Sequence, residues 1–245
     1  MAEKLKVGII GSGYAGMAAA VALSERGIPV TVFESAKQLG GRARGVMHQD
    51  TQLDNGQHLL LGCYRETLSM IKKVGGNIDQ DFLSLPLQLD LHNQFSLLAP
   101  RLPAPLHLLL ALLNAQGLTW RERLKASRFM LTLRNMDFRL SADMTVTELL
   151  HIHGQDQNLK LKLWEPLCIA ALNTPIDKAS AQVMLNVLHD SLNRTRADSD
   201  MLLPQINFTE LFPQRAATYI EQRGSTVLTS CGVSAIQPNT HNIEL

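Results

Sequence analysis

Hydrophobic and polar positions at the beginning of the chain follow the order strand, helix, strand. Leu5–Ile10 is a short, β-branched run that ends at a glycine, as is typical of a buried strand. The alanine- and leucine-rich segment Tyr14–Arg26 predicts a helix, with Gly27 as its stop. Pro29–Phe33 predicts a second strand. Two strands joined through one helix predict a parallel βαβ unit.

The pattern changes several times after this unit. The glycine-rich stretch 40–62 predicts a loop with a short strand around Val46, and Tyr64–Val74 predicts a helix. Leucines then alternate with other residues over 85–91, and a polar tripeptide can turn the chain into Phe95–Leu98. This alternation predicts a β-hairpin.

The region from about 106 to 190 is mainly helical in its pattern. Within it, Thr145 and Glu148 have the spacing of a capping box at a helix start. Residues 207–223 predict another helix, which begins with Asn-x-x-Glu and ends at a glycine.

Strand character returns near the end of the sequence, at Thr226–Thr229 and Val233–Ile236. His241–Leu245 has the pattern of a strand start for which no later segment supplies a partner. We therefore expect a natural protein longer than 245 residues, and the alternative is an ordinary edge strand at a true C-terminus.

Composition indicates a globular protein without a nucleic-acid partner. Of the 245 residues, 45% are hydrophobic and 18% are charged, which is unlike a disordered chain. Lysine and arginine total 23 against 22 acidic residues, so the net charge of +1 gives no electrostatic reason to bind nucleic acid.

The spacing of the cysteines and the length of a leucine-rich apolar stretch indicate where in the cell the protein is located. Cys63, Cys168 and Cys231 are far apart and odd in number, which argues against a disulfide framework or a zinc site and fits a reducing compartment. The N-terminus does not have the pattern of a signal peptide. The apolar run Leu106–Leu113 is far shorter than the roughly 20 residues of a spanning helix. These features predict a cytoplasmic protein that either is soluble or lies on the inner face of the cytoplasmic membrane.

The turn between the first strand and the helix carries a dinucleotide-binding motif, Gly11-Ser12-Gly13-Tyr14-Ala15-Gly16. Gly11 permits the tight turn, Gly13 lets the backbone approach a pyrophosphate, and Gly16 lets helix and strand pack closely. The helix N-terminus then offers free N–H groups to the phosphates. Glu34 ends the second strand, where a carboxylate suits a ribose with free hydroxyls.

Further glycines follow that acid, and they point to the kind of dinucleotide. Gly40-Gly41-Arg42 can lie along the cofactor beyond the pyrophosphate, and Arg42 adds positive charge. The order GxGxxG, acid, LGGR resembles the amine oxidase and carotenoid desaturase superfamily of FAD enzymes. The resemblance implies that the GGR segment contacts the pyrophosphate and ribityl part of FAD.

Two further segments fit the same superfamily. In Asp54-Asn55-Gly56-Gln57-His58, the resemblance implies that the stretch passes close to the flavin, with Gln57 or His58 near the ring and Asp54 bracing the loop. Gly232-Val233 corresponds to a segment whose valine backbone contacts the adenine, and a plain β-turn is the alternative.

Four longer strings resemble one group within the superfamily, the hydroxysqualene dehydroxylase family of bacterial hopanoid synthesis. They are NGQHLLLG with YRET at 55–67, LWEPLC with AALNTP at 163–175, SAQV at 180–183 and SDMLLP at 199–204. In that family, a further C-terminal segment completes the flavin site. This sequence lacks that segment, and its absence puts FAD binding by this chain alone in doubt.

The resemblance implies reductive removal of an allylic hydroxyl from a squalene-type lipid. Reduced flavin would deliver hydride as water departs, and the residue that protonates the leaving hydroxyl is not identified. A carotenoid desaturase acting oxidatively is the nearest alternative. A non-catalytic prenyl-binding protein of the same fold is a third, although the intact FAD motif speaks against it.

One helical segment, 119–135, combines an apolar stripe with basic neighbours. The stripe is Trp120, Leu124 and Leu131, and the basic positions are Arg121, Lys125 and Arg128. Such a helix can lie on an anionic membrane, or it can be a half-buried helix with a solvated face. Trp164, Leu167 and Ile169 are expected to pack in a core or line an apolar pocket.

These inferences combine into one prediction of the fold, which is α/β. A Rossmann-like FAD-binding domain (1–80 and 206–245) is interrupted by a mostly helical α+β substrate domain (81–205). The partner is an isoprenoid lipid, and no metal site is expected. The residues predicted to bind FAD are Gly11, Ser12, Gly13, Tyr14, Ala15, Gly16, Glu34, Gly41, Arg42, Gly56, Gln57, His58 and Val233.

Overall fold

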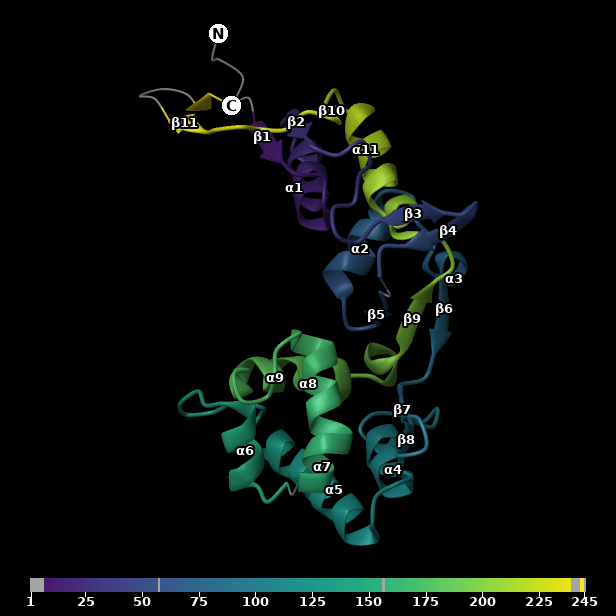
Figure 1. Cartoon of the computed structure of the whole chain (residues 1–245), viewed down its shortest axis with the longest axis vertical. Helices are drawn as coiled ribbons and strands as arrows, with labels where there is room; N and C mark the ends of the chain where they lie inside the picture. Colours follow the sequence, from purple (N-terminus) through teal and green to yellow (C-terminus); the bar gives the residue numbers. More distant parts are fainter. Residues whose placement is uncertain (1–6, 57, 156, 239–242, 245) are drawn as a thin grey trace. The chain divides into compact units, whose positions relative to one another are not determined.

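The structure is a computed structural model and describes residues 7–56, 58–155, 157–238 and 243–244 (Figure 1). The chain forms two compact units, and each is described by itself. The first comprises residues 1–59, 65–83 and 203–245, and the second comprises residues 60–64 and 84–202. The chain thus leaves the first unit, builds the second and returns, and the short segment 60–64 groups with the second unit.

The first unit contains a parallel sheet, two antiparallel strand pairs and five helices among its described residues. Its strands are β1 (Val7–Ile10), β2 (Val30–Phe33), β3 (Gly45–His48), β4 (Thr51–Asp54), β10 (Thr226–Leu228), β11 (Gln237–Pro238) and β12 (Ile243–Glu244). Its helices are α1 (Tyr14–Glu25), α2 (Arg65–Lys73), α3 (Ile78–Asp81), α10 (Phe208–Leu211) and α11 (Pro213–Glu221).

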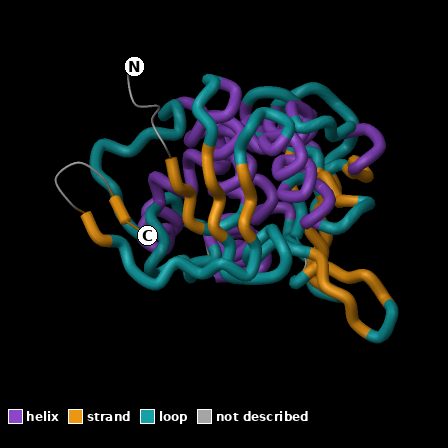
Figure 2. Tube along the Cα trace, turned by 90° about the horizontal axis from the view of Figure 1, so that it is seen from above, coloured by secondary structure: helices purple, strands orange, loops and turns teal. Residues whose placement is uncertain are grey.

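The parallel sheet has the strand order β1-β2-β10, and its strands lie side by side in Figure 2. Val7 pairs with Val30 and Val227 pairs with Val32, both in parallel register. The predicted βαβ unit is therefore present, although the predicted strand start at Leu5 lies outside the described residues. A segment close to the end of the chain supplies the third strand.

Helix α1 packs against α11 and against the sheet. Met17, Val21 and Val32 are fully buried there, together with Ile220 of α11. Arg26 caps the C-terminus of this helix, and Gly27 follows with φ of 73°. This conformation is the one that a glycine stop permits without strain.

An ion pair joins α3 to α11. The Asp81 carboxylate, at the end of α3, accepts two bonds from the guanidinium of Arg215 in α11, one of them at 3.1 Å. This pair holds the pKa of the Asp81 carboxyl below its ordinary value. The Asn77 amide donates a third bond to the same carboxylate, at 2.9 Å.

The prediction of one helix over 207–223 is wrong, because the structure has two. Asn207 caps α10 as expected, accepting a bond from the Glu210 amide at 3.1 Å. Phe212 then leaves helical geometry with φ of −140°. Pro213, which has no N–H to donate, begins α11 as the first residue of a new helix.

Of two predictions near the end of the sequence, one is wrong and the other is confirmed in its described part. Val233–Ile236 is a loop, and the strand that follows is β11. Ile243–Glu244 forms a strand, as its pattern predicts, and its antiparallel partner is the preceding strand β11. The remaining residues of the predicted strand start, 241–242 and 245, lie outside the described residues. In the glycine-rich stretch 40–62, β4 and β5 are strands that the pattern does not predict.

The second unit is mainly helical. Its described strands are β5 (Leu60–Leu61), β7 (Gln88–Leu91) and β8 (Phe95–Leu98), while β6 (Phe82–Leu85) and β9 (Met201–Pro204) stand where the chain passes between the units. Its α-helices are α4 (Leu106–Asn114), α5 (Trp120–Asn135), α6 (Val146–Ile152), α7 (Gln157–Leu159), α8 (Glu165–Leu172) and α9 (Ala181–Leu188). Three further helical turns are η1 (Lys160–Trp164), η2 (His189–Asn193) and η3 (Arg196–Ser199). None of the helices in the described part of the chain combines the length and apolar composition needed to cross a membrane.

Local sequence signals in this unit are confirmed. β7 and β8 form the predicted hairpin, with Asn93 at the turn in the left-handed region (φ 57°). The capping box at α6 is complete, because Glu148 accepts from the Thr145 amide at 2.8 Å and donates its own amide to the Thr145 hydroxyl at 3.2 Å.

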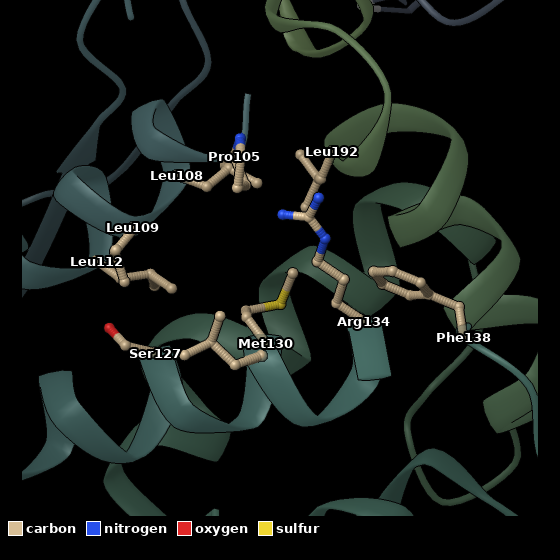
Figure 3. A pocket seen from close by; sticks show the side chains of 10 residues that line it. Pro105, Leu108, Leu109, Leu112, Ser127, Met130, Arg134, Phe138 and Leu192 are labelled. Atoms are coloured by element: carbon tan, nitrogen blue, oxygen red, sulfur yellow. The ribbon is translucent and has the colours of Figure 1, made fainter. Parts of the chain in front are cut away.

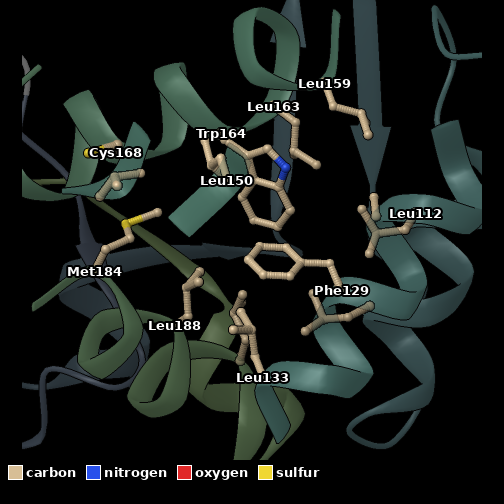
Figure 4. Packing of buried hydrophobic residues seen from close by; sticks show 14 of the residues in the cluster. Leu112, Phe129, Leu133, Leu150, Leu159, Leu163, Trp164, Cys168, Met184 and Leu188 are labelled. Atoms are coloured by element: carbon tan, nitrogen blue, oxygen red, sulfur yellow. The ribbon is translucent and has the colours of Figure 1, made fainter. Parts of the chain in front are cut away.

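The core of the second unit is built around Trp164 and Phe129 (Figure 4). Their rings meet edge to face, with centroids 5.2 Å apart, and the indole N–H donates to Gln155 at 3.0 Å. Leu167 packs partly buried against this core as expected, whereas Ile169 is exposed and the prediction for it is wrong.

Helix α5 is half-buried, but its apolar stripe faces outward. Ala126, Phe129 and Leu133 form the buried face. The stripe identified in the sequence is exposed, with 66% of Trp120, 36% of Leu124 and 49% of Leu131 accessible. The solvated face of this helix is therefore both apolar and basic.

Two of the four family-like strings lie against each other in the second unit. The Gly62 amide donates to the Asp200 carbonyl and the Cys63 amide donates to the Asp198 carbonyl, both at 3.0 Å. A Cβ on Gly62 would stand 1.9 Å from the carbonyl oxygen of Ala197. Only glycine therefore allows this close approach of two backbones.

We expect Gly62→Ala to lower the free energy of unfolding by about 3 kcal/mol or more, because a backbone segment must move to admit the methyl group. Gly232→Ala is the matched control, since a Cβ there meets only an ordinary contact at 3.6 Å. Denaturant unfolding of both variants measures the difference. Equal stability of the two proteins would contradict the steric explanation.

Candidate functional site

The turn between β1 and α1 is shaped by backbone geometry. Gly11 has φ of 94°, which favours glycine, and its amide donates to the Phe33 carbonyl at 2.8 Å. Gly13 stands at the N-cap of α1, and no described side chain caps that helix. The first N–H groups of α1 are thus left to bind another acceptor, as a phosphate would be.

The three glycines of this turn differ in the space around them. A Cβ on Gly16 would lie 2.0 Å from the Gly11 carbonyl oxygen, so Gly16 is required by the fold itself. A Cβ on Gly13 would meet no described protein atom within 4 Å. Gly13 is therefore not needed for packing, and the open space beside it fits a bound pyrophosphate.

The GGR segment lies directly beside this turn. The Gly40 amide donates to the Ser12 carbonyl at 3.1 Å, and Gly40 and Gly13 form a parallel bridge. Gly41 has φ of 61°, and a Cβ there would be 3.3 Å from the Gly13 Cα atom. Arg42 follows and is exposed. The structure thus brings together two motifs that are separated by a helix and a strand.

Glu34 is buried and braces the same turn. One carboxylate oxygen accepts from the Ser12 amide at 2.8 Å and from the Ser12 hydroxyl at 2.6 Å. The other accepts from the Ala36 amide at 2.8 Å and from the Ser35 hydroxyl at 3.3 Å. Burial by itself raises the pKa of the Glu34 carboxyl, but these four bonds outweigh it and hold the pKa below its ordinary value. A ligand hydroxyl at this carboxylate would share it with Ser12 and Ala36, and the 3.3 Å Ser35 bond is the longest of the four. The contact of Glu34 with ribose stays a prediction.

The segment containing Val233 runs beside Glu34. The Cys231 amide donates to the Glu34 carbonyl at 2.8 Å, and the Ser230 amide donates to the Ala36 carbonyl at 3.0 Å. Val233 itself is half-buried. Val233 thus follows a segment that is hydrogen-bonded to the backbone at Glu34, and its contact with adenine stays a prediction.

The loop that follows β4 is tied to α10. The Asp54 carboxylate accepts from the Phe208 amide at 2.8 Å, which is the bracing role expected for Asp54. The His58 ring packs on the Phe208 ring with centroids 4.9 Å apart, and Gly56 lies close to it. Gln57 lies outside the described residues.

Tyr14 belongs to the same aromatic cluster. Its hydroxyl donates to the Phe208 carbonyl at 2.9 Å, and its ring lies 5.3 Å from the Phe212 ring. Burial, with a smaller contribution from the Asp54 charge, raises the pKa of Tyr14 far above its ordinary value. Tyr14 is therefore a neutral hydrogen-bond donor that holds α10 against α1, and Ala15 beside it is exposed.

The α10 residues in this cluster are not identified by the sequence motifs. Phe208 joins Tyr14 and the Asp54 loop, and the Thr209 hydroxyl accepts from the Gly45 amide at 3.0 Å. Their only local signal is the helix cap at Asn207, because the contacts join positions that are more than 150 residues apart.

Three buried polar side-chain atoms in the first unit have no hydrogen-bond partner among the described residues. One is the Ser24 hydroxyl within α1. The other two lie in the loops around the turn and are Nε2 of His58 and Nε of Arg44, the second arginine of the sequence GGRAR. Such atoms are costly unless a ligand or water satisfies them, so we add Arg44 to the candidates. Together with the space at Gly13 and the uncapped helix, they fit an FAD that extends from the turn along the GGR segment. No group of His, Cys, Asp and Glu side chains able to hold a metal ion occurs among the described residues.

Comparison with known proteins agrees with this geometry. Residues 14–244 match the family described as flavin containing amine oxidoreductases. A zeta-carotene desaturase of Arabidopsis thaliana is 27% identical over 221 residues, which cover 81% of this chain and 38% of the relative. A hydroxysqualene dehydroxylase of Sinorhizobium fredii is 27% identical over 237 residues, which cover 91% of this chain and 52% of the relative.

The fold is also that of known oxidoreductase structures. The crystal structure of an oxidoreductase from Methanosarcina mazei aligns with a TM-score of 0.70 at 17% identity, over 98% of this chain and 54% of that chain. The chain thus spans about half, or less, of the length of the proteins it resembles. Because the family match extends over almost the whole sequence, this chain belongs to the flavin containing amine oxidoreductases, an α/β family of oxidoreductases whose cofactor is FAD.

Proposed function

We propose that the protein removes the allylic hydroxyl of hydroxysqualene reductively and forms squalene. The hydroxyl leaves as water after gaining a proton, and a hydride takes its place on carbon. When bound, reduced FAD supplies that hydride. The residues of this chain hold the cofactor, orient the lipid and keep bulk water away from the reacting carbon.

The observation that carries this proposal is the contact between two family-like strings. The parts of these strings that lie in the second unit, 60–63 and 199–202, form one structured element, in which Leu60 pairs with Leu202 and the Gly62 amide donates to the Asp200 carbonyl at 3.0 Å. The two family-like strings therefore contact each other in the folded chain, and both contribute to the structure of the second unit. The hydroxysqualene dehydroxylase of Sinorhizobium fredii supports the same assignment.

A carotene desaturase is the second candidate. The Arabidopsis thaliana relative is as similar to this chain as the dehydroxylase, with 27% identity in each alignment. Both relatives are named for isoprenoid substrates, so the two candidates share the lipid class and differ in the direction of electron flow. A non-catalytic prenyl-binding role is disfavoured by the family match and by the uncapped, glycine-lined turn.

We also propose that the protein works at the inner face of the cytoplasmic membrane. The exposed face of α5 presents Trp120, Leu124 and Leu131 beside Arg121 and Arg128, a combination suited to an anionic lipid surface. Co-sedimentation with phosphatidylglycerol vesicles tests this contact, and a protein that stays in the supernatant at low salt would rule it out.

An anaerobic assay with hydroxysqualene, FAD and a chemical reductant tests the proposed reaction. We expect squalene in the lipid extract by mass spectrometry, and none with a Gly13→Val variant that has lost FAD. Oxidised flavin with zeta-carotene is the parallel arm. Formation of a more unsaturated polyene there, without squalene in the first arm, would replace the dehydroxylase assignment by the desaturase.

A further inference from the structure

We propose that the second unit contains a separate binding site for a single-chain anionic lipid, in the pocket between α4 and α5. The tail would occupy the pocket and the head group would pair with Arg134. All residues that line the pocket belong to the second unit, and none is among the predicted FAD ligands. The site goes beyond the proposed function, and its test requires neither flavin nor turnover.

The lining of the pocket is almost entirely apolar. α4 contributes Leu109 among other aliphatic residues, α5 contributes Met130 and Leu131, and Leu192 of η2 lies at one side (Figure 3). The cavity volume is about 50 Å³, which suits a segment of one hydrocarbon chain rather than two. Leu131 is also half-exposed on the outer face of α5, so the pocket communicates with that surface.

Arg134 is the charged residue of the lining. Its side chain reaches from the last turn of α5 toward Pro105 and Leu192 (Figure 3). This guanidinium has no ion pair or hydrogen bond with another described residue. The Asp137 carboxylate lies 3.8 Å from Nε of Arg139 instead. A guanidinium beside an apolar pocket recognises a phosphate or carboxylate that is joined to a hydrocarbon chain.

Ser127 marks the other polar position of the pocket. It is buried, with 4% of its surface accessible, and its hydroxyl has no partner among the described residues. Ser127 and Arg134 are two helical turns apart on α5, or about 10 Å along the helix axis, so the two polar positions of the lining are well separated. The positive charge of Arg134 at one end and the apolar lining of the pocket favour an anionic amphiphile over a neutral hydrocarbon as the ligand.

Binding of three small probes to the protein tests this site by titration calorimetry below the micellar concentration. The probes are dodecyl phosphate, dodecanol with the same tail, and inorganic phosphate with the same charge. We expect dodecyl phosphate to bind at least roughly tenfold more tightly than dodecanol, because a bond to a charged group adds to the tail contact. We expect no detectable binding of inorganic phosphate at the same concentration.

Variants separate the head group from the tail. Arg134→Gln should reduce the affinity for dodecyl phosphate to that for dodecanol, while Lys178→Gln, which removes an exposed positive charge of the same unit outside the pocket, should change neither. Leu109→Trp should fill the pocket and abolish both, and Met130→Trp provides a second filling variant if the first does not fold. Equal affinity for dodecyl phosphate and dodecanol, competition by inorganic phosphate, or binding that survives both filling variants would overturn the proposal.

Discussion

Gly13→Val is expected to give a folded protein that no longer retains FAD. No described protein atom lies within 4 Å of a Cβ at this position, so the strand, turn and helix can still form. The same space lies at the uncapped start of α1, where the motif places the pyrophosphate. We expect FAD affinity to fall by at least about 100-fold, or ~3 kcal/mol, because the valine side chain and the phosphates compete for one volume. Flavin absorbance per protein and the circular dichroism spectrum measure the two properties.

Gly16→Val is the matched control for this experiment. Its Cβ would stand 2.0 Å from the Gly11 carbonyl oxygen, so the turn itself must move. We expect this variant to lose both the flavin and the folded structure of the first unit. A yellow Gly13→Val protein with normal flavin stoichiometry, or equal unfolding of both variants, would show that the two glycines have been assigned the wrong roles.

Glu34→Ala is expected to weaken FAD binding and to destabilise the first unit together. The variant removes a buried carboxylate that accepts four bonds, and it leaves the Ser12 and Ala36 amides without their acceptor. Each bond to a charged group contributes about 1.5–3 kcal/mol, so we expect a loss of several kcal/mol in total. Ser35→Ala, which removes only the long 3.3 Å bond, should have little effect. Thermal unfolding with and without FAD distinguishes the variants, and unchanged FAD affinity in Glu34→Ala would refute a role at the ribose.

The depressed pKa of Glu34 gives this prediction a pH dependence. The folded state favours the charged carboxylate, so its stabilising contribution is present above the unfolded pKa of about 4.3 and is lost as the pH falls through the lower folded value. FAD retention should therefore be constant from neutral pH to about 5 and fall below about 4. Glu34→Gln, which cannot titrate, should remove the part of this fall that comes from Glu34. Flavin fluorescence during acidification measures the release, and an identical acid profile in the Gln variant would exclude Glu34 as its cause.

The cofactor motif was predictable from sequence because its parts are local. The turn needs a glycine at Gly11 for φ of 94° and another at Gly16 for close packing, and both requirements act within six residues. The capping box at Thr145 and the hairpin turn at Asn93 were predictable for the same reason. Each of these features depends on backbone geometry that a few neighbouring side chains decide.

Long-range packing was not predictable in the same way. The outward direction of the apolar stripe on α5 is an example, because Ala126, Phe129 and Leu133 compete with Trp120 and Leu131 for the core and periodicity alone does not select between them. The break between α10 and α11 at Phe212 is a different case, because Pro213 is a local signal that ends a helix at the preceding residue and the interpretation of 207–223 as one helix overlooked it. The hydrophobic pattern of 207–223 stays helical on both sides of Phe212. In the structure, the rings of Phe208 and Phe212 both contact Tyr14 where the chain leaves helical geometry.

The sequence by itself therefore determined the βαβ unit, the glycine turn, the acid at Glu34 and the family to which these motifs belong. Only the tertiary structure decided that Gly40 and Gly41 lie against Gly13, that Asp54 braces Phe208, and that Gly62 must be a glycine. The physical reason is the range of the forces involved. Backbone conformation and capping are fixed by neighbours in sequence, whereas close approach, burial and unpaired polar atoms depend on which distant segments the folded core brings together.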